Sequence, residues 1–210
     1  MSALAHVLLK RQLPVSGSDL RSSPITDNLE SLGAQIFWQQ EAANLRQLMS
    51  SSSYFPGSVA EKGELQEASR LPQIVCSTAI HEDNPEYQAA LALGCPIFHR
   101  SDVLAALFRE FSQGIAIAGT HGKTTTSSLV GYLLLQAGLD PTIVVGGEVA
   151  AWGGNARIGN SPYLVAEADE SDGSLVKFTA KIGVITNIEL DHPDITALLI
   201  KWWRFFRQFC

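Results

Sequence analysis

A glycine-bounded loop, followed directly by a lysine and two threonines, comes after a short apolar run in the middle of the sequence. The run covers residues 114–118, and the segment after it reads Gly119, Thr120, His121, Gly122, Lys123, Thr124, Thr125. Glycines let backbone N–H groups approach phosphate oxygens, and the N-terminus of a helix adds the positive end of its dipole. The pattern predicts a nucleotide phosphate site, with Lys123 on the β- and γ-phosphates and the Thr124 hydroxyl on Mg²⁺.

This segment matches the general phosphate-loop pattern G-x-x-x-x-G-K-[ST] imperfectly. Ile117 stands at the first glycine position, and Gly119 leads instead. An ordinary glycine-containing turn is the alternative, but Gly-Lys-Thr between a buried strand and a helix favours the phosphate site. His121 has two interpretations: it contacts a phosphate, or it fills the loop.

Two later segments carry side chains that suit a metal ion. Glu167 follows an apolar run at 163–166, and His192 follows another run at 182–186 after a short loop. Because the carboxyl ends of parallel strands meet at the ligand crevice, we expect both side chains to point toward Thr124. The competing interpretation makes Glu167 a helix cap and His192 a surface turn residue.

These residues depend on strands and helices that alternate along the chain. The expected strands are residues 15–19, 34–38, 74–77, 96–98, 114–118, 142–145, 163–166 and 182–186. The expected helices are residues 4–12, 26–32, 85–93, 101–111 and a stretch ending at 136. Residues 49–64 and the glycine-rich residues 146–160 are predicted as loops. The alternation predicts an α/β fold with two parallel-sheet units and a domain boundary near residues 99–112.

Composition limits the class of protein. The chain has 210 residues, 46% of them hydrophobic, and a net charge of −6, so we expect a globular protein that does not bind nucleic acid. Its three cysteines are odd in number and lack metal-ligand spacing, which favours a reducing compartment. No apolar run approaches the roughly 18 residues of a membrane span. Lys10 and Arg11 follow the first apolar stretch, unlike the charges of a signal peptide, so we expect a cytoplasmic location.

Four separated segments, in chain order, resemble the Mur ligases, the ATP-dependent ligases of peptidoglycan precursor synthesis. They are residues 1–5 with 16–19, 118–126, the acidic segment 167–172, and 186–194. The resemblance covers about residues 1–194. Ser171 fits the members that add L-alanine better than the members that recycle muropeptides.

The resemblance implies two domains. Residues 1–99 would form a Rossmann-like domain for the nucleotide sugar UDP-N-acetylmuramate, and residues 100–210 would form the central ATP-binding domain. The implied reaction joins L-alanine to UDP-N-acetylmuramate with ATP, through an acyl phosphate. Catalysis would come mostly from positioning and from charge neutralisation by Lys123 and Mg²⁺. Thr124, Glu167 and His192 would hold the metal.

Other residues have weaker assignments. By the resemblance, Asn155 and Arg157 border the muramoyl substrate, although a turn with a solvated arginine explains them nearly as well. Asp19 ends the first expected strand about where a dinucleotide fold places its ribose acid.

The chain also departs from the family pattern. The strand and glycine-rich turn that would precede Met1 are missing, Gln39-Gln40 stands where members commonly carry Gly-His, and the resemblance fades after Asp194. We therefore expect a chain truncated at both ends, and a C-terminal domain supplied by a separate chain stays open. The aromatic and basic tail, 198–209, is expected to pack on the central sheet, with a membrane-surface helix as the alternative.

Two other functional classes stay open besides the ligase. One is an inactive or regulatory ATP-binding fragment of such a ligase. The other is an interaction or membrane-surface protein that uses the tail.

Overall fold

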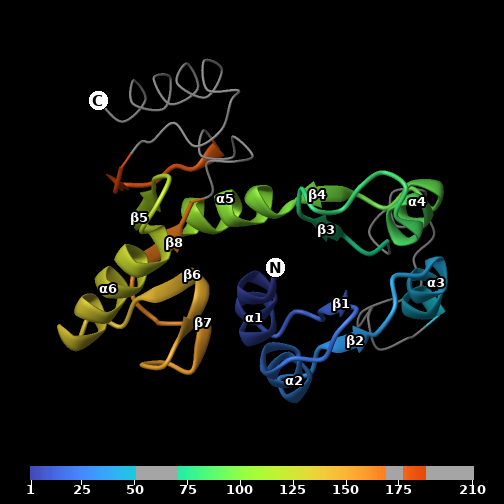
Figure 1. Cartoon of the computed structure of the whole chain (residues 1–210), viewed down its shortest axis with the longest axis horizontal. Helices are drawn as coiled ribbons and strands as arrows, with labels where there is room; N and C mark the ends of the chain where they lie inside the picture. Colours follow the sequence, from blue (N-terminus) through green and yellow to red (C-terminus); the bar gives the residue numbers. More distant parts are fainter. Residues whose placement is uncertain (51–70, 169–176, 188–210) are drawn as a thin grey trace, which may run out of the picture. The chain divides into compact units, whose positions relative to one another are not determined.

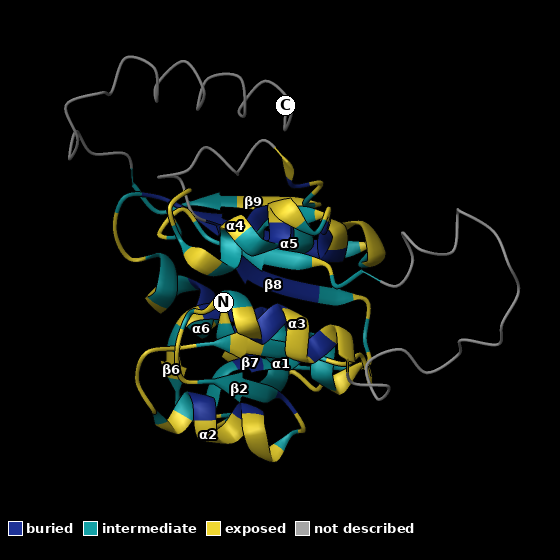
Figure 2. Cartoon of the chain, turned by 90° about the vertical axis from the view of Figure 1, so that its right-hand side faces the viewer, coloured by how far each residue is buried: buried dark blue, intermediate teal, exposed yellow. Residues whose placement is uncertain are grey.

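The computed structural model describes residues 1–50, 71–168 and 177–187. Its helices are α1 (Ser2–Lys10), α2 (Pro24–Ser31), α3 (Ala42–Ser50), α4 (Pro85–Ala92), α5 (Arg100–Glu110) and α6 (Lys123–Gln136). Its strands are β1 (Ser16–Ser18), β2 (Gln35–Phe37), β3 (Ile74–Cys76), β4 (Ile97–His99), β5 (Gln113–Ala118), β6 (Thr142–Val149), β7 (Gly154–Arg157), β8 (Tyr163–Glu167) and β9 (Ile182–Ile185). Figure 1 labels these elements along the chain except β9, which is labelled in Figure 2.

The chain divides into two compact units. Unit 1 consists of Met1 and Leu8–Arg100, and unit 2 consists of Ser2–Val7 and Ser101–Cys210. The first turns of α1 therefore belong to unit 2, where Ala3, Leu4 and Val7 are buried in the core.

Unit 2 is built on a five-stranded sheet with the order β7-β6-β8-β5-β9. The strands β6, β8, β5 and β9 run parallel, and β7 pairs with β6 in the antiparallel sense. Parallel strands that are covered on both faces of the sheet have nearly continuous apolar sequences, as β5 and β8 have. The buried middle of β8 is dark blue in Figure 2.

The side chains of β8 alternate between two apolar clusters. Leu164 and Ala166 belong to a cluster that includes residues of α1 and α5. Val165 belongs to another cluster, against which Val130 and Leu134 of α6 pack. Because successive strand residues point to opposite faces, Glu167 lies on the same face as Val165, the face that α6 covers.

Helix α6 lies close to the sheet because it carries a glycine at the contact. A Cβ on Gly131 would lie 2.8 Å from the Cδ1 atom of Ile143 in β6. The helix begins directly after Gly122, whose φ of 76° is in the left-handed region that glycine adopts without strain. The cap position therefore carries no side chain, and no side-chain hydrogen bond caps the first turn.

Unit 1 contains two separate pairs of parallel strands, β1 with β2 and β3 with β4. Two of its helices have side-chain caps. Ser23 forms a capping box with Thr26 before α2, and Asn84 precedes Pro85 at the start of α4.

The structure confirms the α/β class with parallel sheets and corrects two details. Residues 146–160 are not a single loop, because β6 continues to Val149 and β7 (154–157) returns along it as an edge strand. A register shift between Val144 and Val149 accommodates the irregular, glycine-containing part of this pairing. In addition, α3 occupies residues 42–48, for which the sequence predicted no element, and it continues through residues 49 and 50, the start of the predicted loop 49–64.

Candidate functional site

Three strand ends of unit 2 meet at one edge of the sheet. In the parallel register Ile117 of β5 pairs with Glu167 of β8, and Ala118 of β5 pairs with Ile185 of β9. The loop that follows β5, residues 119–122, is called the glycine loop below. The glycine loop, the last residue of β8 and the residues after β9 therefore emerge side by side, as the topology of a parallel sheet requires.

The structure brings Thr124 and Glu167 into direct contact. The Thr124 hydroxyl lies 3.0 Å from Oε1 and 2.9 Å from Oε2 of Glu167, so its single proton is shared between the two carboxylate oxygens. The backbone N–H of Gly146, in β6, donates to Glu167 Oε2 at 2.8 Å. A Cβ at Gly146 would lie 2.8 Å from the same oxygen, so a larger residue there would displace the carboxylate. The contacts that the structure describes for Glu167 are thus with the Thr124 hydroxyl and the Gly146 N–H.

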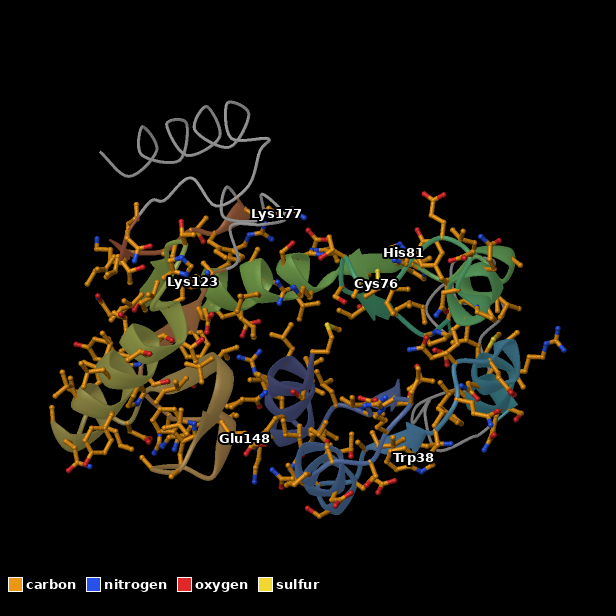
Figure 3. The ribbon with its side chains drawn as sticks, viewed as in Figure 1. Trp38, Cys76, His81, Lys123, Glu148 and Lys177 are labelled. Carbon is orange, nitrogen blue, oxygen red and sulfur yellow. The ribbon has the colours of Figure 1, made fainter. Side chains whose placement is uncertain are left out.

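Lys123 is the first residue of α6, and its side chain turns back over the glycine loop (Figure 3). Its Nζ donates to the carbonyl oxygen of Gly119 at 2.6 Å and to that of Thr120 at 3.2 Å. The ammonium group is therefore held beside the N-terminus of a helix, where backbone N–H groups have no acceptor within the helix. Both features attract an anion.

The glycine loop is attached to the two residues that follow β9. The side chain of Asn187 bonds both polar groups of the His121 backbone, and the Thr186 hydroxyl donates to the His121 carbonyl at 2.5 Å. Sequence reasoning placed Asn187 inside a motif but gave it no role. The backbone of His121, rather than its imidazole, makes these contacts.

Asn155 and Arg157, the expected substrate residues, contact other parts of unit 2. The Asn155 side chain donates to Ser2 Oγ at 2.8 Å. Arg157 pairs with Asp140 at 2.6 Å and also donates to the carbonyl oxygen of Pro141 at 2.7 Å. These contacts hold the β6–β7 hairpin, and a role toward substrate stays a prediction for both residues.

Asp140 is an acceptor just before β6, at the open end of that hairpin. The backbone N–H of Asn160 donates to it, and so does the guanidinium group of Arg157. These two groups, the Asn160 N–H foremost, hold the pKa of the Asp140 carboxyl below its ordinary value.

A second polar cluster lies in unit 1 around Glu86, in the first turn of α4. Glu86 Oε2 accepts from the Ser18 hydroxyl at 2.5 Å, and Oε1 accepts from the Asn44 amide at 2.6 Å. The Asn84 amide donates to Gln40 Oε1 at 2.7 Å, so Gln40 has a structural contact at the position where the sequence departs from the family pattern. Asp19 follows β1, and its Oδ1 accepts the Arg21 backbone N–H at 3.2 Å.

Part of the predicted site lies outside the described residues. His192, the acidic segment 169–172 and the tail 198–209 all belong to that part of the sequence. Within residues 1–50, 71–168 and 177–187 there is no group of three or more His, Cys, Asp and Glu side chains that could hold a metal ion. In the same ranges, no helix is long and apolar enough to cross a membrane.

Comparison with known proteins gives the family. A family model described as "Mur ligase family, catalytic domain" matches residues 1–112, and one described as "Mur ligase middle domain" matches residues 117–198. The first of these alone covers more than half of the 210 residues. The chain belongs to the Mur ligase family.

Members with high sequence identity share one name. A protein of Acaryochloris marina named UDP-N-acetylmuramate--L-alanine ligase is 70% identical over 209 residues, which are 100% of this chain and 40% of that protein. A protein of the same name from Trichormus variabilis is 67% identical over 196 residues, 92% of this chain and 39% of that protein. The chain thus spans about 40% of the length of these Mur ligases.

Solved Mur ligase structures share the fold. A UDP-N-acetylmuramate-alanine ligase from Thermotoga maritima has a TM-score of 0.79 and 28% identity, and the match covers 100% of this chain and 44% of that one. A UDP-N-acetylmuramate:L-alanyl-gamma-D-glutamyl-meso-diaminopimelate ligase from Neisseria has a TM-score of 0.81 and 26% identity, covering 99% of this chain and 64% of that one. The α/β architecture described above is therefore the Mur ligase architecture.

Proposed function

We propose that this chain binds Mg-ATP at the glycine loop and serves an ATP-dependent ligase that joins L-alanine to UDP-N-acetylmuramate in peptidoglycan precursor synthesis. The observation that carries the proposal is the contact between Thr124 and Glu167 beside Lys123. It brings a hydroxyl, a carboxylate and an ammonium group to the start of one uncapped helix. The names of the relatives support the substrates.

The donor atoms fit Mg²⁺. It is a hard cation that prefers oxygen ligands and is usually held by one or two protein groups together with phosphate oxygens and water. Thr124 Oγ1 and Glu167 supply such oxygens, and Gly146 holds the carboxylate in place through its N–H. His192 would complete the set in this proposal. When bound, the ion would neutralise phosphate charge.

In the proposed reaction, a carboxylate oxygen of UDP-N-acetylmuramate attacks the γ-phosphorus of ATP, and the bond to the β–γ bridging oxygen breaks to release ADP. The amine of L-alanine then attacks the acyl carbon, loses a proton and displaces inorganic phosphate. Lys123 and the first-turn N–H groups of α6 hold the phosphate groups and offset their negative charge. These residues act by positioning and electrostatics.

Titration calorimetry with Mg-ATP tests the nucleotide site. Lys123→Ala is expected to weaken binding roughly ten- to hundred-fold, because a charge-assisted contact to phosphate is lost. The matched control is Lys181→Ala, since Lys181 is an exposed lysine of the same unit that lies directly before β9 and outside the glycine loop. Equal affinity of wild type and Lys123→Ala, or no binding by wild type, would overturn the assignment.

Turnover separates the ligase from the alternative of an ATP-binding chain without ligase activity. Purified chain is incubated with Mg-ATP, UDP-N-acetylmuramate and L-alanine, and the amide product is measured by mass spectrometry. Product that depends on all three supports the ligase. Binding of Mg-ATP without product supports the inactive or regulatory ATP-binding chain.

A further inference from the structure

The two residues after β9, Thr186 and Asn187, contact the glycine loop although the proposed chemistry gives them no part. They lie 65 and 66 residues from His121 in sequence, and they reach it with side-chain atoms. The backbone of the same segment is also attached to the loop, because the Thr120 N–H donates to the Asn187 carbonyl oxygen at 3.2 Å.

The carboxamide of Asn187 forms hydrogen bonds with both the N–H and the carbonyl group of His121. Its Oδ1 accepts the His121 N–H at 2.9 Å, and its Nδ2 donates to the His121 carbonyl oxygen at 3.1 Å. The N–H can only donate and the carbonyl can only accept, so these partners fix the orientation of the amide. No other side chain of similar size offers an acceptor and a donor at this spacing; aspartate has two acceptors, and leucine has neither.

Gly119, at the start of the loop, also lies close to Thr186. Its φ is +137°, a region that residues with a Cβ rarely adopt, and a Cβ there would overlap the Thr186 hydroxyl oxygen. The Thr186 N–H also donates to the carbonyl oxygen of Ala118 at 3.0 Å. The loop is thus held at Thr120 and His121 by the two residues that follow β9.

This attachment decides where the loop's polar groups point. The His121 N–H is directed to Asn187, and the His121 carbonyl is directed to Asn187 and Thr186. The N–H groups of the first turn of α6 follow directly and have no acceptor within the helix. The His121 carbonyl oxygen therefore points away from the start of α6. An anion bound there would contact the first-turn N–H groups without repulsion from that oxygen.

We propose that Asn187 is a positioning residue that holds the glycine loop in the conformation that accepts the phosphate groups of a nucleotide. The inference rests on the proposed function, since it deepens the assignment of the glycine loop. Asn187 acts through the His121 backbone and does not touch the nucleotide. A loop ordered before binding loses less conformational freedom when the ligand arrives, so the attachment raises affinity.

The test uses three variants of the full chain. Asn187→Ala removes both side-chain hydrogen bonds, and Asn187→Asp keeps the shape and the acceptor but places an oxygen against the His121 carbonyl. The control is Asn160→Ala, which removes an exposed asparagine amide of the same unit that donates to Asp140 at 3.3 Å. Each protein is measured for amide hydrogen exchange, Mg-ATP affinity and melting temperature.

Asn187→Ala is expected to bind Mg-ATP about ten-fold more weakly than wild type, because it loses two hydrogen bonds. Asn187→Asp should also bind more weakly than wild type, because it loses one hydrogen bond and places an oxygen against the His121 carbonyl. The His121 amide should exchange at least about ten-fold faster in Asn187→Ala, while amides of β5 and β8 keep their protection. Asn160→Ala should change neither quantity. The Asn187→Asp result separates hydrogen bonding from shape, because the two side chains have nearly the same volume.

The possible results distinguish the attachment of the loop, the positioning role of Asn187 and the proposed function. Unchanged exchange of the His121 amide in Asn187→Ala overturns the attachment itself, whatever the nucleotide does. Faster exchange with unchanged Mg-ATP affinity overturns the positioning role and leaves the proposed function standing. Wild-type protein that does not bind Mg-ATP overturns the proposed function, and the positioning role fails with it.

Discussion

The helices α4 and α6 begin in opposite ways, although each has a glutamate close to its first turn. Asn84 caps α4 by accepting the N–H groups of Glu86 at 2.9 Å and Tyr87 at 3.1 Å. Gly122 precedes α6 and offers no side chain, so the first-turn N–H groups receive no such cap. Satisfied donors stabilise a helix, and unsatisfied donors are available to a ligand.

The two glutamates near these helix starts, Glu86 and Glu167, also differ in what binds their carboxylates. Glu86 is bonded by side chains from β1 and α3, Ser18 and Asn44, and so connects three elements of unit 1. Glu167 is bonded by the Thr124 hydroxyl and a backbone N–H, at the edge where the strands of unit 2 end. Similar carboxylate chemistry thus serves the fold in one unit, and we propose that it serves a ligand in the other.

Within this comparison, the largest expected effect is a different response of the two glutamate variants to magnesium. Glu167→Gln should lower the affinity for Mg-ATP about ten-fold, because a neutral amide is a poor ligand for a hard cation. Calorimetry with ATP, with and without Mg²⁺, measures this. Glu86→Gln is the matched control and should leave both affinities unchanged.

Gly146→Ala examines the same carboxylate without changing its charge. The added Cβ would lie 2.8 Å from Glu167 Oε2, so we expect a loss of Mg-ATP affinity in the same direction as for Glu167→Gln. Gly154→Ala, in the paired strand β7, is the control, since its Cβ would meet no atom within 4 Å. Equal affinities for wild type, Glu167→Gln and Gly146→Ala would remove the distinction between the two glutamates.

A change of intermediate size tests the capped helix. Asn84→Ala should lower the free energy of unfolding by about 1 kcal/mol, the usual cost of losing an N-cap side chain. Urea denaturation followed by circular dichroism measures the loss, and calorimetry should show unchanged Mg-ATP affinity. A loss of nucleotide affinity in Asn84→Ala would mean that the cap of α4 is not purely structural.

The smallest effect concerns Asp140, which is bonded at the solvent-exposed hairpin. Its pKa is lower in the folded chain because Asn160 and Arg157 donate to the carboxylate. Its contribution to stability is therefore present above the unfolded pKa of about 3.9 and is lost as pH falls through the lower folded value. The difference in melting temperature between wild type and Asp140→Asn should shrink as the pH is lowered from about 6 to about 3. A difference that stays constant over this range would contradict the assignment.

The sequence predicted local features of the site well and long-range ones poorly. The strand–loop–helix order around residues 119–122 follows from adjacent residues, and the position of Glu167 follows from the end of a strand. The donor from Gly146 could not be predicted, because residues 146–160 were interpreted as a single loop and the acceptor, Glu167, lies 21 residues further along the chain. Asn187 lay in a recognised motif, but its partner is 66 residues away, and only the order of the strands brings the two together.

The alternation of β8 has a consequence for insertions and deletions. Leu164 and Ala166 face one apolar cluster while Val165 faces the other, so the position of Glu167 depends on whether an odd or an even number of residues separates it from them. One residue added to the turn before Tyr163 changes only a connection. One residue added between Val165 and Glu167 would exchange the two faces, move the carboxylate away from Thr124, and direct an acid toward the cluster on the other side. A single-residue insertion or deletion is thus more disruptive within β8 than in the loops beside it.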